Sequence, residues 1–504
     1  MGRAAAMGIL TLPGAAFGGD GLRLVSWNIS NYSGGRVPEL QTAFYTSFEG
    51  RSMSPDVLVM QEMISEAGVP ALLGALNSAP SSPGDWAAGP FIDGPDSDSA
   101  IFYRTGKVEF LNVFTLPADP GTSGAPRDVR RYDLGLVGYD SPSTQLAIYS
   151  VHMKSGSGST DQQRRLIEAT RIRDDAETLD PDINIIIAGD FNVQSSSQAA
   201  YQELVGSQTN NNGRFLDPIG TPGSWNNNFA FRFVHTQDPS GAGGMDDRHD
   251  QILLDPSLGD GAGLEYVGNF GQTYSTSTWN DPDHSYRAWG NDGTSFDLSL
   301  SVAGNAMVGP TIAQALIAMA SGGGHLPVLL DMLVPARVAA DEEINLGEVP
   351  FGALASGSLL VGNAGDVATW GAGGIALLHY TLEADPGIVI DTGPFSDAAD
   401  GPVNEHEFVA DLALDAGGGS FEAEIRVLSD DPDDPVFSVR VTGTVAGCND
   451  ADFATPLGTL DFFDVQVFLG AFAGHEARAD LTGEGNFDFF DVQTFLSAFA
   501  GGCP

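Results

Sequence analysis

The chain has 504 residues, with 66 acidic and 22 basic side chains and a net charge of −44. This length favours two to four domains at ~150 residues each, and a hydrophobic fraction of 42% excludes wholesale disorder. Gly, Pro or a charge interrupts every apolar run before it reaches the ~18 residues of a membrane span, so no transmembrane segment is expected.

The charge is unevenly distributed along the chain. Residues 338–504 contain 29 acidic and only three basic side chains. This composition suits a solvated extracellular module or a calcium binder, and it does not favour nucleic-acid binding by counterion release. Adaptation to salt or to solubility is the alternative explanation. Only the N-terminal part is expected to hold an anionic substrate, through local Arg side chains or a metal.

Two features indicate export. Residues 1–20 combine an early Arg3, a short apolar stretch and small residues, which is typical of a secretory signal peptide. A ragged N-terminus is the alternative. Cys448 and Cys503, the two cysteines of the chain, flank the C-terminal tail, and we expect a disulfide between them in an oxidising compartment. The sequence thus predicts a secreted or cell-surface-associated protein.

After the N-terminal segment, the sequence divides into three regions with different hydrophobic patterns. Within residues 21–335, buried strand patterns alternate with helical ones, which predicts a layered α/β domain. Residues 338–447 contain short strands with alternating apolar positions and predict an all-β antiparallel sandwich. In residues 448–504, the segment 461–474 recurs almost unchanged as 488–501, which predicts a small helical module of two loop-helix units.

Polar side chains stand at the ends of the predicted apolar strands of the first domain. A strand end needs no carboxylate, amide or imidazole, because burying one costs free energy unless it is paired. Each residue alone has an ordinary explanation as a cap or a turn. Together they favour a site on one edge of the sheets. These residues are Asn28, Glu62, His152, Asp190, Asn192, Asp250 and His325.

The motifs that contain these residues, WN, QE, VHMKSG, GDFN, RxDxIL and HLPV in this order, resemble the endonuclease/exonuclease/phosphatase superfamily over residues 22–332. The resemblance implies a four-layer α/β sandwich, with two packed β-sheets flanked by helices. It also implies hydrolysis of phosphoesters with a divalent cation, Mg²⁺ or Mn²⁺, and therefore a nucleic acid or another phosphodiester as substrate.

The same resemblance implies roles for individual residues. Glu62 is expected to bind the metal, and Asn28 to support the metal or the phosphate. His325 is expected to act as general base, with Asp250 fixing its tautomer.

The remaining roles concern the attacking water and the phosphate. Asp190 is expected to orient the water, while Asn192 and His152 bond phosphoryl oxygens. Lys154 and Arg127 are weaker candidates for phosphate contacts.

One position departs from the family pattern. The family usually has an acidic residue directly before the last histidine, and here Gly324 precedes His325. The loss of an oxygen ligand predicts weaker metal binding. Alternatively, Asp246 or Asp247 supplies the missing oxygen, or the enzyme is impaired.

The second and third regions resemble known modules, and the second resembles the immunoglobulin-like repeats often appended to secreted bacterial proteins. Residues 338–447 resemble an immunoglobulin-like domain and contain no catalytic cluster. The tail resembles a dockerin type I-like, EF-hand-like repeat that binds Ca²⁺, and its first loop lacks the first and fifth ligands. Such modules imply a cell-surface or scaffold partner. The expected calcium ligands are Asp480, Thr482, Glu484, Asn486, Asp488 and Asp491.

The sequence therefore predicts a secreted metal-dependent phosphodiesterase, either an endonuclease or an exonuclease. Two alternatives remain open. One is a hydrolase of phospholipid head groups, like sphingomyelinase, or of phosphomonoesters. The other is an extracellular binding or assembly protein whose catalysis is impaired at Gly324.

Overall fold

The computed structural model describes residues 20–94, 97–116, 127–241, 243–411 and 420–503. The chain divides into two compact units, one of Met1–Pro335 with Asp366–Ala376 and one of Ala336–Gly365 with Leu377–Pro504. The predicted signal peptide lies outside the described residues except for Asp20. Among the described residues, no helix has the length and apolar character that crossing a membrane requires.

The first unit contains two β-sheets. One has the strand order β10-β12-β1-β2-β4-β3, with β11 paired to β12, and the other has the order β5-β6-β7-β8-β9. The strands of the first sheet are β1 (Leu22–Tyr32), β2 (Val57–Met63), β3 (Trp86–Ala88), β4 (Asp98–Arg104), β10 (Glu265–Tyr266), β11 (Arg287–Ala288) and β12 (Val328–Leu333). Those of the second are β5 (Val108–Leu116), β6 (Val129–Leu136), β7 (Gln145–His152), β8 (Asn184–Asp190) and β9 (Asp250–Leu254).

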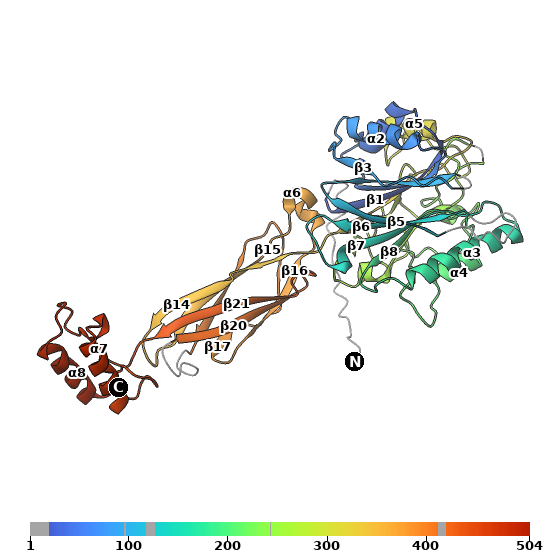
Figure 1. The fold of residues 1–504 in the computed structure, drawn as a ribbon. Coiled ribbons are helices and arrows are strands. Elements are labelled where there is room, and N and C mark those ends of the chain that lie inside the picture. The colour runs from blue at the N-terminus through green and yellow to red at the C-terminus, as the bar shows by residue number, and fades with distance from the viewer. Residues whose placement is uncertain (1–19, 95–96, 117–126, 242, 412–419, 504) are drawn as a thin grey trace. The chain divides into compact units, whose positions relative to one another are not determined.

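The two sheets pack face to face, and helices cover their outer faces (Figure 1). A buried polar contact joins the sheets, because Gln61 Nε2 of β2 donates to Ser150 Oγ of β7 at 3.3 Å. The helices against the first sheet are α1 (Val37–Tyr45), α2 (Gly68–Ser78) and α5 (Gly309–Met319), and those against the second are α3 (Ser159–Ala176) and α4 (Ala199–Val205). The predicted α/β fold of the N-terminal region is confirmed.

Each sheet of this unit contains one parallel pair of strands among its described members. In the first sheet the pair is β1 with β2, and in the second it is β7 with β8. All seven residues of β8 are buried, because sheet and helices cover both of its faces, and this explains its unbroken apolar run. The carboxyl ends of the two parallel pairs are where the site is built.

The second unit contains two further sheets, of order β13-β15-β19-β17 and β14-β21-β20-β16-β18. Buried and exposed residues alternate along β20 and β21, so one face of the sheet packs into the core. The strands are β13 (Val338–Ala340), β14 (Glu343–Val349), β15 (Ala355–Asn363), β16 (Leu378–Ala384), β17 (Ile388–Ile390), β18 (Phe395–Asp397), β19 (Asn404–Ala410), β20 (Ser420–Ser429) and β21 (Val436–Val445).

The expected wholly antiparallel arrangement is wrong at one strand, because β14 pairs with β21 in parallel. A parallel pair needs a long connection, and residues 350–435 connect these two strands.

The short helix α6 (Val367–Trp370) belongs to the first unit, although it lies within the region predicted as a sandwich. Gly21 N donates to Trp370 O at 2.6 Å, and Ala376 N donates to Val334 O at 2.9 Å.

The C-terminal residues form α7 (Phe462–Ala473) and α8 (Phe489–Gly501). Each helix begins at an aspartate that forms a reciprocal capping box with the aspartate three residues later, Asp461 with Asp464 and Asp488 with Asp491. A disulfide joins Cys448 and Cys503, as expected.

Candidate active site

The carboxyl ends of the two parallel strand pairs bring four of the expected residues together. Asn28 comes from β1 and Glu62 from β2, while His152 and Asp190 are the paired last residues of β7 and β8. Asp250, the first residue of β9, lies opposite Asp190. Open α/β sheets build their sites at such edges because the strand ends there leave side chains uncovered.

An amide joins the two carboxylates of the cluster. Asn28 Nδ2 donates to Glu62 Oε1 at 3.0 Å and to Asp190 Oδ2 at 3.3 Å, and Asn28 Oδ1 accepts from Ser30 N at 3.1 Å. Asn31 N donates to Glu62 Oε2 at 2.8 Å. Asn28 therefore fixes the spacing of the carboxylates from the two sheets.

His152 faces both carboxylates of the cluster. Its Nε2 lies 3.7 Å from Glu62 Oε1 and 3.5 Å from Asp190 Oδ2, while Nδ1 lies 3.3 Å from Ser97 Oγ. Burial lowers the pKa of His152, and the Arg127 guanidinium adds to this while Asp190 opposes it. A neutral imidazole at this place is a hydrogen-bonding group that can donate or accept.

His325 forms a dyad with Asp250. Its Nδ1 lies 2.8 Å from Asp250 Oδ2, its Nε2 lies 3.8 Å from Asp190 Oδ2, and its carbonyl oxygen accepts from Trp27 Nε1 at 3.0 Å. Burial alone would lower the pKa of His325, but the charges of Asp250 and Asp190 raise it to about 10. The dyad therefore holds a proton on the imidazole at neutral pH in the absence of a metal.

Thr236 is a contributor that the sequence motifs do not reveal. Its Oγ1 donates to Asp250 Oδ2 at 2.6 Å and accepts from Asp250 N at 3.2 Å. Thr236 thereby orients the carboxylate that orients His325. It lies in a loop without a motif, so no sequence signal was available to find it.

Backbone geometry at β8 aims Asp190 into the site. Gly189 has a φ of +147°, and a Cβ there would lie 1.9 Å from Val151 O of the neighbouring strand. Asn192 N donates to Asp190 Oδ1 at 3.0 Å. Burial alone would raise the pKa of Asp190, but the imidazoles of His325 and His152 lower it, so the group stays ionised.

The structure gives three of the residues that were predicted to contact phosphate, Asn192, Arg127 and Lys154, partners within the protein. The Asn192 side-chain amide donates to Met153 O at 3.1 Å, and Arg127 Nη1 donates to His152 O at 3.1 Å. Both side chains therefore hold the loop after β7. Lys154 Nζ lies 3.7 Å from Asp161 Oδ1 and is only about one-third exposed.

The backbone at Gly324 leaves no room for the aspartate that the family pattern expects. Its φ is +68°, and a Cβ there would lie 2.4 Å from Ala320 Cβ. Asp247 Oδ1 accepts from Asn226 Nδ2 at 2.7 Å. Neither Asp246 nor Asp247 belongs to a group of three or more potential metal ligands among the described residues.

Three side chains in the loop of residues 273–296 that could stack on a substrate or bond its phosphate are not accessible to it. Tyr286, Arg287 and Trp289 are all fully buried. The Arg287 guanidinium donates to backbone carbonyl groups, among them His284 O at 2.6 Å.

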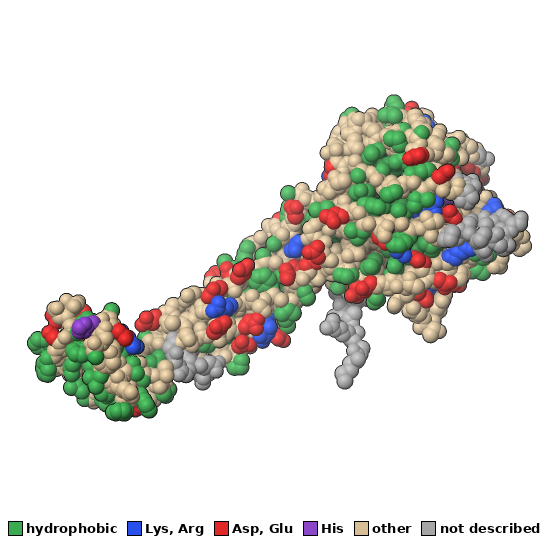
Figure 2. Space-filling view, viewed as in Figure 1, with side chains coloured by type: hydrophobic (Ala, Val, Ile, Leu, Met, Phe, Trp, Pro, Cys, Tyr) green, Lys and Arg blue, Asp and Glu red, His purple; other side chains and the backbone are tan. Residues whose placement is uncertain are grey.

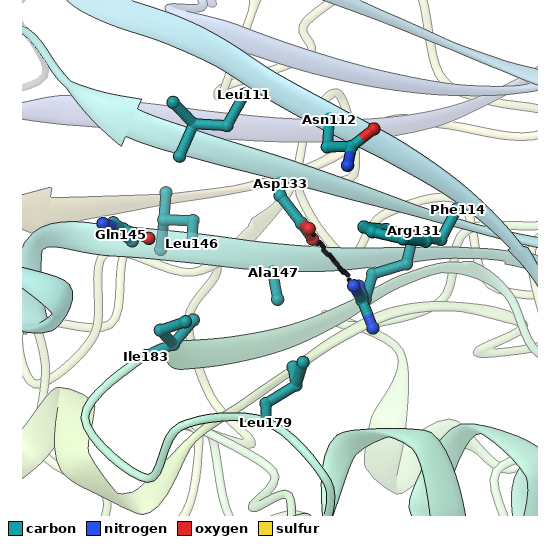
Figure 3. Close-up of a pocket in the computed structure, with 10 residues that line it drawn as sticks. All are labelled: Leu111, Asn112, Phe114, Arg131, Asp133, Gln145, Leu146, Ala147, Leu179 and Ile183. Carbon is teal, nitrogen blue, oxygen red and sulfur yellow. Dashed lines mark hydrogen bonds and ion pairs between the residues drawn. The ribbon is translucent and has the colours of Figure 1, made fainter.

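The cavity in Figure 3 lies away from the site. It has a volume of about 310 Å³ and lies on the second sheet, between β5, β6, β7 and the segment after α3. Its charged side chains are paired, since Arg131 bonds Asp133 at 2.9 Å and Asp175 at 2.6 Å. None of the expected site residues lines it.

In the tail, the expected calcium ligands lie around one loop, and two of their carboxylates accept hydrogen bonds from backbone amides of that loop. Asp480 Oδ2 accepts from Gly485 N at 2.6 Å, and Asp491 Oδ1 accepts from Thr482 N at 3.1 Å. Asp488 raises the pKa of Glu484, as do the weaker effects of burial, Asp491 and Asp480. Figure 2 shows hydrophobic side chains on the visible face of this region. Two Phe-Phe pairs of the tail are exposed, Phe462 with Phe463 and Phe489 with Phe490.

Comparisons with known proteins agree with the class that the fold and the site define. The model of the Endonuclease/Exonuclease/phosphatase family matches residues 25–282, more than half of the chain. The chain belongs to this family. Members of the family typically hydrolyse phosphoric esters, commonly with Mg²⁺. His325 lies beyond the matched residues, so its place in the site depends on the contact with Asp250.

Several solved structures are also similar. The human Nocturnin catalytic domain with bound sulfate has 14% identity and a TM-score of 0.37, covering 62% of this chain and 94% of that one. TDP2 of D. rerio, in complex with a single-stranded DNA product, has 14% identity and a TM-score of 0.32, covering 62% and 98%. Beta toxin from Staphylococcus aureus has 15% identity and a TM-score of 0.33, covering 61% and 99%. No curated protein sequence matches the chain.

Proposed function

We propose that the chain is a secreted phosphodiesterase that requires Mg²⁺ or Mn²⁺ and cleaves nucleic acid. The observation that supports this most is the cluster in which Asn28 joins Glu62 and Asp190, with two imidazoles facing Asp190. Carboxylates and imidazoles meeting at one point suit proton transfer next to an anionic centre.

The donor atoms fit a hard divalent cation. Glu62 offers carboxylate oxygens, the atoms that Mg²⁺ prefers, and we assign the cation to this residue. Asn28 would support the cation by holding the Glu62 carboxylate through its Nδ2, because its Oδ1 accepts from Ser30 N. A cation held there would neutralise phosphoryl charge and, as a nearby positive charge, lower the pKa of His325.

The proton of the attacking water goes to His325 in this proposal. Asp250 and Thr236 hold the imidazole so that Nδ1–H points at Asp250 and Nε2 points towards Asp190. Asp190 accepts a hydrogen bond from the same water and orients its lone pair. His152, on the other side of Asp190, donates to a phosphoryl oxygen as charge develops.

Charge favours short or single-stranded substrates over long duplexes. Residues 1–337 contain 37 acidic and 19 basic side chains, so they lack the excess of positive charge that neutralises many phosphates at once. A single phosphodiester held at the cluster needs few such contacts.

A substrate panel with metals tests the proposal. The full chain is assayed on single-stranded DNA, duplex DNA, RNA, sphingomyelin and a phosphomonoester, with Mg²⁺, Mn²⁺ or chelator. We expect metal-dependent cleavage of nucleic acid, and a loss of ~10²–10⁴-fold in kcat for His325→Ala or Asp190→Ala. Turnover of sphingomyelin or the monoester alone would reassign the substrate, and no turnover at all would favour an impaired binding protein.

The C-terminal region supports export and anchoring. The Cys448–Cys503 disulfide fits an oxidising compartment outside the cytosol. The crowded carboxylates of Asp480, Glu484 and Asp488 repel one another, and Ca²⁺ would relieve this repulsion. We assign this region to a dockerin-like calcium module that attaches the enzyme to a surface or scaffold partner, following an immunoglobulin-like spacer.

A further inference from the structure

Helix α3 contains a buried acid that the proposed chemistry does not use. Glu168 is 2% exposed, and it lies on the face of α3 that packs against the second sheet. Burying a carboxylate costs free energy unless hydrogen bonds or charges compensate it. The partners of Glu168 therefore indicate what the burial achieves.

The carboxylate of Glu168 joins two loops. Oε1 accepts from Arg127 N at 3.0 Å, and Oε2 accepts from Lys154 N at 3.3 Å. Lys154 is in the loop that directly follows His152 and the end of β7, and Arg127 is separated from the start of β6 by one residue. One side chain thus ties the loop behind His152 to the neighbouring segment and to α3.

The same loop is held at each successive peptide group. Arg127 Nη1 donates to His152 O, Asn192 Nδ2 donates to Met153 O, and Arg165 Nη1 donates to Lys154 O. On the amide side, Met153 N donates to Asp190 O at 2.8 Å, and Lys154 N donates to Glu168. The backbone at and after His152 is therefore fixed through both its carbonyl and its amide groups. Because the imidazole is attached to this backbone, the backbone's direction decides where the imidazole points.

We propose that Glu168 is a positioning residue of the active site, whose carboxylate fixes the loop after β7 so that the His152 imidazole faces Glu62 and Asp190. This role rests on the proposed function. It extends the site by a residue outside the strand ends, acting through His152 and without contact to the substrate.

The electrostatics of Glu168 agree with a functional role. Burial raises its pKa to about 8, against the opposing effects of the Lys154 amide and of Arg127. The two N–H donors therefore do not fully offset the cost of burial. Groups with strongly shifted pKa values gather at functional sites, where placement outweighs local stability.

The experiment compares Glu168→Gln with Asp174→Asn, a matched control that removes an exposed carboxylate from the same helix. The assays are run above pH 8, where Glu168 is ionised. There Glu168→Gln keeps the shape but turns an NH₂ group against a backbone N–H that the carboxylate accepts from. We expect kcat to fall ~10–100-fold with little change in KM, since a displaced catalytic group costs up to ~10²-fold. Asp174→Asn is expected to leave kcat unchanged.

A double-mutant cycle separates positioning from general stability. In the His152→Ala background, Glu168→Gln is expected to have no further effect on kcat, because the group that it positions is gone. The proposal would be overturned if Glu168→Gln lowered kcat by the same factor in the His152→Ala background as in the wild type. It would also be overturned if the Glu168→Gln enzyme behaved like the Asp174→Asn control. If Glu168→Gln fails to fold, Glu168→Asp, which is shorter and reaches only one amide, replaces it in the same cycle.

A measurement without substrate distinguishes this proposal from the proposed function. The ¹⁵N resonances of the His152 imidazole are recorded in the wild type, in Glu168→Gln and in Asp174→Asn. A shift in Glu168→Gln alone supports the positioning role even if the wild type cleaves none of the substrates. Identical His152 resonances in all three proteins would reject it, whatever the wild-type activity.

Discussion

At the scale of single residues, His325 is defined by the acids around it. The charges of Asp250 and Asp190 overcome burial and raise its pKa to about 10. Since an unfolded histidine titrates near ~6.5, the paired imidazolium stabilises the fold fully below that pH. This contribution is lost as the pH rises through about 10, because the folded protein then releases the proton.

We therefore predict a histidine with a strongly raised pKa in the metal-free protein. ¹⁵N NMR titration is expected to show His325 titrating far above ~6.5 in the wild type and near that value in Asp250→Asn. Urea unfolding between pH 6.5 and pH 10 is expected to show a steeper loss of stability in the wild type than in Asp250→Asn. Equal slopes would mean that the dyad is not protonated as the structure indicates.

Gly324, which stands where the family pattern has an acidic residue, gives a second prediction at this scale. Gly322 and Gly324 share a φ of +68°, but only Gly324 has a neighbour within 4 Å of a built Cβ. Gly322→Asp is expected to cost the backbone strain alone, ~1–2 kcal/mol. Gly324→Asp is expected to cost more, with no gain in Mg²⁺ affinity. Denaturant unfolding and Mg²⁺ titration of both variants measure this, and tighter Mg²⁺ binding by Gly324→Asp would refute it.

At the scale of elements, the parallel pair β7–β8 depends on a close approach of its backbones. A methyl group at Gly189 would meet Val151 O, an atom that cannot move without breaking the sheet. Asp190 follows directly, so a shift of this strand moves the carboxylate out of the site.

Gly189→Ala is accordingly predicted to destabilise the first unit by at least ~2 kcal/mol and to abolish activity. Gly135→Ala on β6 is the control, because the nearest atom to its built Cβ is Leu111 Cδ1 at an ordinary 3.7 Å. Chemical denaturation compares the two. A stability for Gly189→Ala equal to that of the control would contradict the close approach of Gly189 to Val151 O.

At the scale of the whole molecule, the two compact units have separate hydrophobic cores. The disulfide and the acidic loop belong to the second unit, whose C-terminal helices bury only a small core around Phe468 and Phe495. Small modules of this kind gain much of their stability from cross-links and bound ions.

We predict that reducing the disulfide or removing Ca²⁺ destabilises only the second unit, as measured by calorimetry of the full chain. Reduction of Cys448–Cys503 removes a cross-link over 55 residues, worth ~4 kcal/mol in the chain-entropy model. Chelation of Ca²⁺ removes stabilisation by mass action. Both treatments are expected to lower the melting temperature of the C-terminal helices and to leave the melting temperature of the first unit unchanged. Cys448→Ser serves as the control that responds to chelator but not to reductant.

The sequence by itself determined the features that local patterns record. Apolar runs that end in Asn28, Glu62, His152 and Asp190 indicated the strands and the chemistry at their ends, because a buried strand tolerates such groups only in a paired site. The repeat of residues 461–474 in 488–501 likewise indicated two equivalent helices with the same caps.

Only the tertiary structure decided how distant segments meet. Thr236 and Glu168 carry no motif, and their partners lie 14 to 41 residues away in the chain. Tertiary packing fully buries Tyr286, although it lies in a polar stretch of the sequence. The left-handed backbone at Gly324 was equally invisible. Sequence patterns report how a segment partitions between core and solvent, whereas the direction of a side chain depends on packing between segments that no local period encodes.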